Sequence, residues 1–226
     1  LQDQREAGGG RVKTLVIFDL DGTLLHTLDD LAAAANHALA EQELPVHPVE
    51  QYKTFVGDGV YKLIERMTPP AQRADTALAA RLKEGFDRYY AAHGEELTAP
   101  YPGVLDTLDA LRERGVICAV LSNKPHEFSV PLCKRFFGDR LRFVHGQRQG
   151  YPRKPDRRLV TELLELADAQ PEDCLYVGDS GVDMQTAKNA GVFAVGALWG
   201  FRTREELEQA GADTVAGSIE EILHLL

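Results

Sequence analysis

Short apolar runs and amphipathic stretches alternate along most of the chain. Runs rich in β-branched residues, each followed by turn residues, predict strands at residues 14–18, 116–121, 142–145, 174–177, 192–198 and 214–216. Between these runs, apolar positions at helical spacing predict helices at residues 104–114, 127–137, 157–167, 184–190, 204–210 and 219–226. The alternation predicts an α/β fold: a doubly wound, Rossmann-like parallel sheet with helices on both faces.

One long stretch departs from this alternation, because it has helical patterns but no convincing strand pattern. The helical patterns run over residues 28–43, 49–55, 60–67 and 71–93. Thr27 is expected to cap the first of these helices, with Asp29 and Asp30 in its first turn. The stretch therefore predicts a small all-helical insertion in the α/β fold.

The expected domain boundaries follow from this contrast. Residues 12–26 and 99–226 are expected to form the α/β core, and residues 27–98 the helical insertion. Residues 1–11 contain three consecutive glycines and no starting Met, so we expect a tail or an added segment there.

Composition and charge narrow the range of partners. The 226 residues are 44% hydrophobic and 27% charged, which is typical of a folded globular protein. A net charge of -10 disfavours nucleic acid and anionic lipid as partners, and no apolar run approaches the length of a membrane span. We expect a cytoplasmic protein that is a monomer or a homodimer. Three scattered cysteines, Cys118, Cys133 and Cys174, are expected to be reduced.

Two acidic residues stand directly after the first predicted strand. Asp19 and Asp21 follow the apolar run at residues 15–18, which places them at the carboxyl end of that strand. Ligands of open α/β sheets bind at this edge, and Gly22 would let the backbone approach a ligand closely. The same segment is also compatible with an ordinary turn between a strand and a helix.

A second acidic pair follows another predicted strand. Asp179 stands just after the strand at residues 174–177, and Asp183 follows four residues later, in the first turn of the next helix. Carboxylates gathered at two strand ends would repel one another strongly unless a cation lay among them. An all-oxygen site of this kind suits Mg²⁺. Alternatively, Asp183 is an ordinary acidic residue at a helix N-terminus.

Two further strand ends carry polar groups. Ser122 and Asn123 follow the strand at residues 116–121, where a hydroxyl and the next amide can bind a phosphate oxygen. Lys154 precedes a predicted helix and can direct its ammonium toward the carboxylates, although a single lysine in a loop is usually just solvated. The convergence of these strand ends favours a site for a phosphorylated ligand.

These motifs resemble those of the haloacid dehalogenase superfamily of phosphohydrolases. Its four motifs are matched in order by Asp19-x-Asp21-Gly22-Thr23, Ser122, Lys154 and Gly178-Asp179-x-x-x-Asp183. The resemblance covers the chain from about residue 12 to its end, and the helical insertion resembles the small cap domain of one subgroup. Within the superfamily the chain is most similar to phosphoglycolate phosphatases, through Ser122-Asn123-Lys124-Pro125, Arg153-Lys154-Pro155-Asp156 and Trp199-Gly200-Phe201-Arg202.

The resemblance implies a Mg²⁺-dependent phosphatase that acts through an aspartyl-phosphate. Asp19 is implied to be the nucleophile, and Asp21 the acid and base. The implied Mg²⁺ ligands are Asp19, the backbone carbonyl of Asp21, Asp179 and Asp183, the last directly or through water. The implied phosphate-binding residues are Ser122, Asn123 and Lys154.

The implied substrate is a small phosphorylated metabolite, with 2-phosphoglycolate as the first candidate. The cap is expected to supply specificity through Gly57, Asp58 and Gly59, although this segment is also typical of a simple connection between helices. Arg202 and His26 are compatible either with a substrate contact or, for Arg202, with capping a helix or pairing at the surface.

Several alternatives stay open. A pyrophosphatase, a sugar-phosphate phosphatase or a phosphomutase of the same superfamily would share most of these motifs. A different class, a non-catalytic phospho-acceptor module similar to receiver domains, also combines clustered acids, a hydroxyl and a lysine. That module lacks both a helical insertion of this size and a second acid at the position of Asp21. A relative that has become a binding protein is disfavoured because every chemical position is filled.

Overall fold

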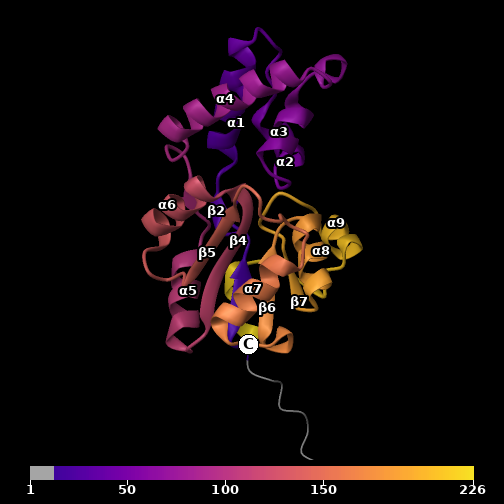
Figure 1. The fold of residues 1–226 in the computed structure, drawn as a ribbon. Helices are drawn as coiled ribbons and strands as arrows, with labels where there is room; N and C mark the ends of the chain where they lie inside the picture. The colour runs from indigo at the N-terminus through magenta and orange to yellow at the C-terminus, as the bar shows by residue number, and fades with distance from the viewer. Residues whose placement is uncertain (1–12) are drawn as a thin grey trace, which may run out of the picture.

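The computed structural model describes residues 13–226, so the tail expected at residues 1–11 lies outside the described residues. At its centre is a six-stranded sheet in the order β5-β4-β1-β6-β7-β8 (Figure 1). The strands are Leu15–Phe18 (β1), Ile117–Pro125 (β4), Phe143–Gln147 (β5), Cys174–Gly178 (β6), Phe193–Ala197 (β7) and Thr214–Ala216 (β8). Each neighbouring pair is parallel, which confirms the predicted α/β fold.

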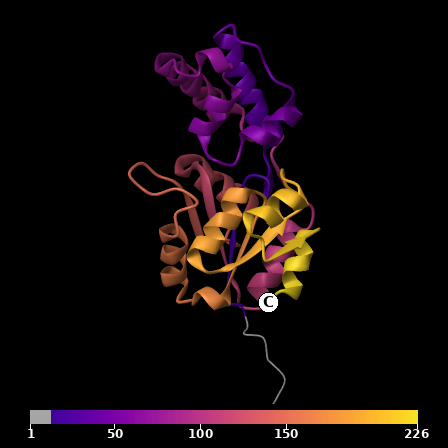
Figure 2. The same cartoon turned by 90° about the vertical axis from the view of Figure 1, so that its right-hand side faces the viewer.

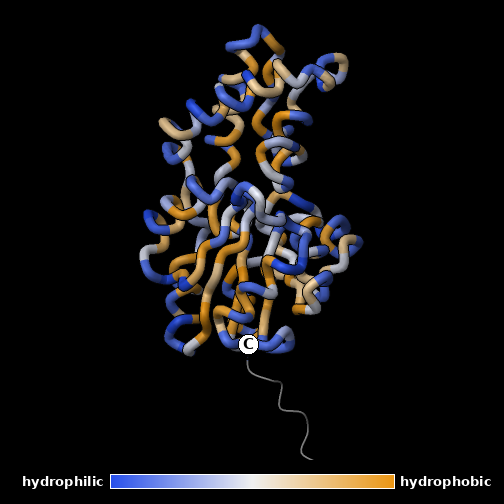
Figure 3. Tube along the Cα trace, viewed as in Figure 1, coloured by the Kyte–Doolittle hydropathy of each residue, from blue (hydrophilic) through white to orange (hydrophobic). Residues whose placement is uncertain are grey.

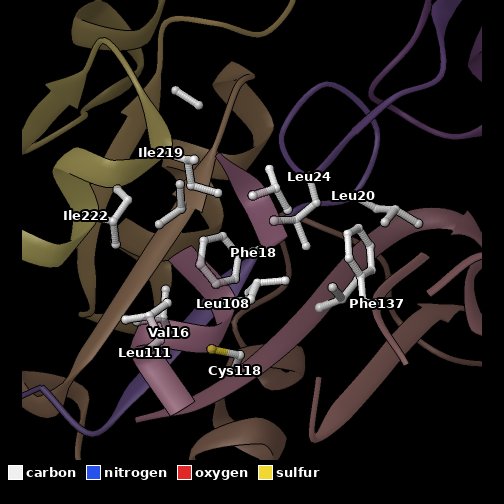
Figure 4. Packing of buried hydrophobic residues seen from close by; sticks show 14 of the residues in the cluster. Val16, Phe18, Leu20, Leu24, Leu108, Leu111, Cys118, Phe137, Ile219 and Ile222 are labelled. Atoms are coloured by element: carbon white, nitrogen blue, oxygen red, sulfur yellow. The ribbon is translucent and has the colours of Figure 1, made fainter. Parts of the chain in front are cut away.

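Alternate residues of the central strand β1 face opposite sides of the sheet. Val16 and Phe18 pack in one apolar cluster (Figure 4), and Leu15 and Ile17 pack in a second cluster on the other face. Successive side chains of a strand point to opposite faces, so a strand that is apolar at every position needs cover on both sides. All four residues of β1 are buried, as this pattern requires.

Helices cover the sheet on both faces, as Figures 1 and 2 show. One face is covered by Val104–Glu113 (α5), His126–Phe137 (α6) and the short 3-10 helix Ile219–His224 (η4). The other face is covered by Arg158–Ala167 (α7), Gly181–Ala190 (α8) and Arg204–Ala210 (α9), with the 3-10 turn Pro171–Asp173 (η3) before β6. No helix within residues 13–226 has the length and apolar character needed to cross a membrane.

Residues 27–98, here called the helical segment, stand beyond the carboxyl edge of the sheet (Figure 1). The segment contains Leu28–Glu41 (α1), Val49–Gln51 (η1), Tyr52–Phe55 (α2), Val60–Met67 (α3), Pro70–Gln72 (η2) and Thr76–His93 (α4). Its helices bury an apolar cluster of their own, with Leu39, Met67 and Leu82 at its centre. In Figure 3 the most hydrophobic stretches are the strands of the sheet, whereas hydrophobic and polar residues alternate along these helices.

Two connections join the helical segment to the sheet, and they are tied to each other. The chain enters through Leu25–His26 (β2) and leaves through Ala99–Pro100 (β3), which pair as a short antiparallel ladder. In the first turn of α1, the Asp30 carboxylate accepts hydrogen bonds from the backbone N–H groups of Leu97 and Thr98 and from the Thr98 hydroxyl, at 2.8–3.1 Å. Asp30 therefore holds the outgoing connection against the incoming one.

Several local predictions differ from the structure. Thr27 precedes α1, but its side chain makes no capping hydrogen bond, so the predicted cap was wrong. The helix predicted from residue 71 begins at Thr76, because Asp75 caps it by accepting a hydrogen bond from the backbone N–H of Leu78. β4 continues to Pro125, past the predicted end at residue 121, and the last predicted helix is the 3-10 helix η4.

Candidate active site

The carboxyl ends of three strands lie side by side. β1 pairs with β4 on one side and with β6 on the other, and Phe18 is in register with both Val120 and Val177. The residues just after these positions are therefore neighbours, because parallel strands end at the same edge of the sheet. This register brings together Asp19, Ser122, Asn123 and Asp179, as the sequence predicted.

Asp19, Asp179 and Asp183 form a buried acidic triad. Each offers a carboxylate oxygen within 4.8 Å of the other two, and none of these residues is more than 4% exposed. Burial and the charge of Asp183 raise the pKa of Asp19 well above its ordinary value, although Lys154 opposes the shift. Burial and Asp183 also raise the pKa of Asp179 to about 7. The triad therefore concentrates more negative charge than its surroundings neutralise.

Lys154 supplies part of the missing positive charge. Its Nζ lies 2.9 Å from Oδ1 of Asp19 and 2.7 Å from Oδ1 of Asp183, and its side chain is 1% exposed. Burial alone would lower the pKa of Lys154, but the carboxylates of Asp183 and Asp19 raise it well above its ordinary value. Lys154 is therefore a buried cation fixed between two carboxylates, and not a solvated loop lysine.

Two residues that the sequence analysis did not single out hold Asp183 in place. Ser180 donates to Oδ2 of Asp183 from its backbone N–H at 3.1 Å and from its hydroxyl at 2.5 Å. The Tyr176 hydroxyl donates to Oδ1 at 3.2 Å. Asp183 lies in the first turn of α8 and also belongs to the triad. The two interpretations of Asp183, as an acidic residue at a helix N-terminus and as a member of a cation site, are therefore compatible.

Two glycines let the backbone come close enough to form the triad. A Cβ atom added to Gly22, which has a φ of +87°, would collide with the carboxylate of Asp179. A Cβ atom added to Gly178 would collide with the side chain of Asp183. A larger residue at either position would push the carboxylates apart, which explains both glycines physically.

The triad fits a hard divalent cation. Carboxylate oxygens are the ligands that such ions prefer. The raised pKa values of Asp19 and Asp179 reflect burial and mutual repulsion that a bound cation would relieve. Moreover, Oδ1 of Asp19 is ion-paired with Lys154 but accepts no hydrogen bond from the described residues. This buried oxygen is therefore available as a metal ligand.

Asp21 lies outside the triad and faces a second buried lysine. Nζ of Lys124 lies 3.2 and 3.3 Å from the two carboxylate oxygens of Asp21. The same ammonium lies over the ring of Tyr90 in α4, 4.5 Å from the ring centroid. Burial alone would lower the pKa of Lys124, but Asp21 and Tyr90 raise it above its ordinary value. The sequence motif contained Lys124 without indicating a role for it.

A pocket lies between this edge of the sheet and the helical segment. Its volume is about 50 Å³. Polar residues line it from the sheet, namely Asp19, Asp21, Ser122, Asn123 and Lys124. Mostly apolar residues line it from the helical segment, namely Leu31, Val56, Gly57, Gly59, Val60, Leu63, Phe86 and Tyr90.

Asn123 connects the two sides of the pocket. Its Nδ2 donates to the carbonyl of Gly57 at 3.4 Å, and its Oδ1 accepts from the backbone N–H of Lys154 at 3.0 Å. Ser122 lies next to it and accepts a hydrogen bond from the backbone N–H of Lys124 at 3.2 Å. The residues predicted to bind phosphate therefore lie together beside Asp19.

The remaining candidates lie at the margin of the pocket or outside it. Asp58 forms an ion pair with Arg66 at 2.5 Å and lines a separate cleft. Arg202 donates to backbone carbonyls at the end of α2, including that of Val56 at 3.0 Å, so its guanidinium caps that helix. His26 lies 3.5 Å from the carboxylate of Asp29 and is not among the residues that line the pocket.

This fold and this arrangement of carboxylates agree with what the chain is similar to. The family model described as haloacid dehalogenase-like hydrolase matches residues 16–197. The chain therefore belongs to the haloacid dehalogenase-like hydrolase family.

Similar proteins narrow the class further. A phosphoglycolate phosphatase of Pseudomonas putida is 36% identical over 219 residues, which cover 95% of this chain and 80% of that protein. A phosphoglycolate phosphatase of Vibrio parahaemolyticus is 34% identical over 218 residues, covering 94% of this chain and 95% of that protein. The solved structure of a predicted phosphoglycolate phosphatase from Haemophilus somnus is 30% identical, has a TM-score of 0.89, and covers 96% of this chain and 99% of that one. These relatives confirm the predicted resemblance and the prediction of a phosphoric monoester hydrolase.

Proposed function

We propose that this protein hydrolyses 2-phosphoglycolate in a Mg²⁺-dependent reaction through a phosphorylated Asp19. The observation that carries the proposal is the place of Asp19, which lines the pocket, belongs to the acidic triad and lies 2.9 Å from the Lys154 ammonium. The substrate is supported by the similar proteins, which are phosphoglycolate phosphatases.

In the first step, a carboxylate oxygen of Asp19 attacks phosphorus in line and forms a new bond to it. The bond between phosphorus and the ester oxygen breaks, and Asp21 gives its proton to that oxygen, so glycolate leaves as an alcohol. Asp21 lines the same pocket as Asp19, which supports this division of roles.

In the second step, water attacks the phosphorus atom of the phosphorylated Asp19. Asp21, now a carboxylate, takes a proton from this water. The bond between phosphorus and Asp19 breaks, which releases inorganic phosphate and restores the Asp19 carboxylate. Lys154, Ser122 and the Asn123 amide bind the equatorial phosphate oxygens, whose charge has to be stabilised in both transition states.

The acidic triad and the backbone carbonyl of Asp21 would hold Mg²⁺. When bound, the ion supplies positive charge that offsets the repulsion between Asp19 and the phosphate. Asp183 would contribute directly or through water, while Lys154 keeps it oriented by the ion pair of 2.7 Å.

We propose further that the helical segment, residues 27–98, is a cap domain that closes the pocket and contributes to specificity. Its apolar side chains exclude water from the charged edge of the sheet. Gly57 and Gly59 line the pocket, and Asp58 between them fixes the loop through its ion pair with Arg66. A small metabolite as the partner, no binding of nucleic acid or membrane, a monomeric or homodimeric state and a cytoplasmic location stay predictions.

A kinetic panel tests the proposal. With saturating Mg²⁺, we expect kcat/KM to be highest for 2-phosphoglycolate, and lower for sugar phosphates and inorganic pyrophosphate. If pyrophosphate or a sugar phosphate were the best substrate, the substrate assignment would fail and the phosphatase assignment would stand. If no phosphomonoester were hydrolysed, the proposed function itself would be wrong. The Asp19→Asn variant, which keeps the size of the side chain, is the control for contaminating phosphatases.

A further inference from the structure

One end of the pocket combines a buried cation with a buried hydroxyl. Among residues 13–226, Lys124 is the one lysine or arginine that lines this pocket, and its side chain is 3% exposed. A lysine ammonium has three donors, and the two contacts with Asp21, at 3.2 and 3.3 Å, are longer than is usual for charge-assisted hydrogen bonds. The Lys124 ammonium can therefore bind a further anion.

Tyr90 faces the same end of the pocket from α4. The Lys124 ammonium lies over its ring, 4.5 Å from the centroid. The hydroxyl is buried and has no hydrogen-bond partner in the part of the chain that the structure describes. Tyr90 lines the pocket, and because buried hydroxyl groups normally have a partner, its hydroxyl is an available donor for a ligand there.

The surroundings of these two groups favour a small anion over a large polar group. Phe86 and Phe128 also line the pocket, pack against the Tyr90 ring with centroids 5.5 and 5.3 Å away, and offer no polar side-chain atoms. A carboxylate placed here would meet one ammonium and one hydroxyl, both already desolvated, so its hydrogen bonds would be strong.

We infer that Lys124 and Tyr90 form a subsite for the carboxylate of the leaving group. The inference rests on the proposed function, which places the ester oxygen beside Asp21. In 2-phosphoglycolate one methylene separates the ester oxygen from the carboxylate carbon. An ester oxygen at Asp21 therefore brings the carboxylate to the cation that adjoins Asp21, which is Lys124. The subsite selects phosphomonoesters that carry a carboxylate two bonds from the ester oxygen.

Two substrates of similar size test the subsite: 2-phosphoglycolate, which has the carboxylate, and ethyl phosphate, which does not. The readout is the specificity ratio, kcat/KM for 2-phosphoglycolate divided by kcat/KM for ethyl phosphate, because a loss of catalysis common to both substrates cancels in it. We expect Lys124→Met to lower this ratio by about 10- to 100-fold. We expect Tyr90→Phe to lower it by about 3- to 10-fold, because the ammonium remains.

Two variants in α4 serve as matched controls. Lys83 also pairs with a carboxylate, that of Asp87, and also lies over a tyrosine ring, that of Tyr61 at 5.6 Å, but it does not line the pocket. Tyr89 precedes Tyr90 and packs on His37 outside the pocket. Lys83→Met and Tyr89→Phe are expected to leave the specificity ratio unchanged.

The outcomes separate the subsite from the proposed function. If Lys124→Met lowered both kcat/KM values equally, Lys124 would only position Asp21, and the subsite would be refuted. The same holds if the wild-type protein hydrolysed ethyl phosphate as efficiently as 2-phosphoglycolate, although it would still be a phosphatase. If the wild-type protein hydrolysed no phosphomonoester, both proposals would fall. Should Lys124→Met not fold, Tyr90→Phe decides the matter, because it removes a single oxygen atom.

Discussion

The carboxyl edge of the sheet and the helical segment face one pocket with opposite chemistry. The edge of the sheet lines it with the charged side chains of Asp19, Asp21 and Lys124. The rest of the acidic triad and Lys154 are buried next to Asp19. The helical segment presents mainly apolar side chains such as Leu63 and Phe86. The sheet therefore supplies the charges, and the helices supply the surroundings of low dielectric constant in which those charges interact strongly.

The two regions are also held in different ways. Adjacent strands fix the register of the triad, and each carboxylate has partners within the α/β part. The helical segment is tied to that part through a few polar contacts, among them those of Asn123 with Gly57 and of Arg202 with Val56. Asp30 holds the two ends of the segment together. We therefore expect substitutions at the sheet edge to change both kcat/KM and the free energy of unfolding. Substitutions at the two connections, β2 and β3, and at the residues that hold them are expected to change mainly the free energy of unfolding.

The largest effect is expected from Lys154→Met, which removes the buried cation from the charged edge of the sheet. Removing the buried ammonium leaves Asp19 and Asp183 uncompensated, which is expected to cost about 3–5 kcal/mol in metal-free buffer. It also removes a donor for the phosphate oxygens, so kcat/KM is expected to fall by about 10²- to 10³-fold. Urea unfolding and steady-state kinetics measure the two effects.

An exposed ion pair of similar length provides the control for Lys154→Met. Nζ of Lys134 lies 2.6 Å from Oδ1 of Asp139, but the two side chains are 69% and 87% exposed. Lys134→Met is expected to change neither the free energy of unfolding nor kcat/KM measurably, because exposed pairs contribute little. Equal effects of the two substitutions would contradict the role given to burial.

The next largest effect is expected where Asp30 holds the outgoing connection of the helical segment against the incoming one. Asp30→Ala removes the acceptor of the hydrogen bonds from Thr98, which is 6% exposed, and is expected to lower the free energy of unfolding by about 2–4 kcal/mol. Asp29→Ala, at the neighbouring half-exposed position, is the control and is expected to have little effect, because its contact with His26 is solvent-accessible. A loss as small as that of the control would show that Asp30 does not hold the connections together.

A smaller effect is expected from Mg²⁺, which tests the electrostatics of the acidic triad through its effect on stability. The pKa of Asp179 is raised from 3.8 to about 7, so without a cation its contribution to stability is fully present below pH 3.8 and is lost as the pH rises through about 7. Mg²⁺ should therefore raise Tm more at pH 8 than at pH 5.5. At a Mg²⁺ concentration of 100 Kd the stabilisation is about 2.7 kcal/mol.

Thermal melts with EDTA or Mg²⁺ at the two pH values measure this difference. Asp179→Asn has no carboxylate to titrate at this position, so the difference between the two pH values should shrink in that variant. A Tm shift that is larger at pH 5.5, or equal at both pH values, would contradict the assignment of the triad as the cation site.

The sequence predicted the chemistry of the sheet edge better than that of the helical segment. Asp19 and Ser122 follow apolar runs directly, and Asp179 follows one after a single glycine, so strand topology alone places the three together. Asp183 was predictable because it lies in the first turn of the helix after β6. These positions depend on local patterns and on the general rule that parallel strands end at one edge.

Contacts between distant parts of the chain could not be predicted in the same way. Tyr90 reaches Lys124 only because α4 packs over the end of β4, and no local pattern encodes that packing. The two-residue strands β2 and β3 are too short for an alternating pattern, and they lie more than seventy residues apart. Thr27 had the composition of a helix cap, but the fold uses Asp30 of the same turn to bind the outgoing chain.

Trapping of the covalent intermediate tests the central claim most directly. Protein mixed with ³²P-labelled substrate and Mg²⁺ and quenched in acid within one turnover should retain label, and mass spectrometry should place it on the peptide that contains Asp19. Asp19→Asn should retain none and should lose about 10⁴-fold or more in kcat, because the nucleophile is gone. Normal turnover by Asp19→Asn, or label on a different residue, would contradict the account.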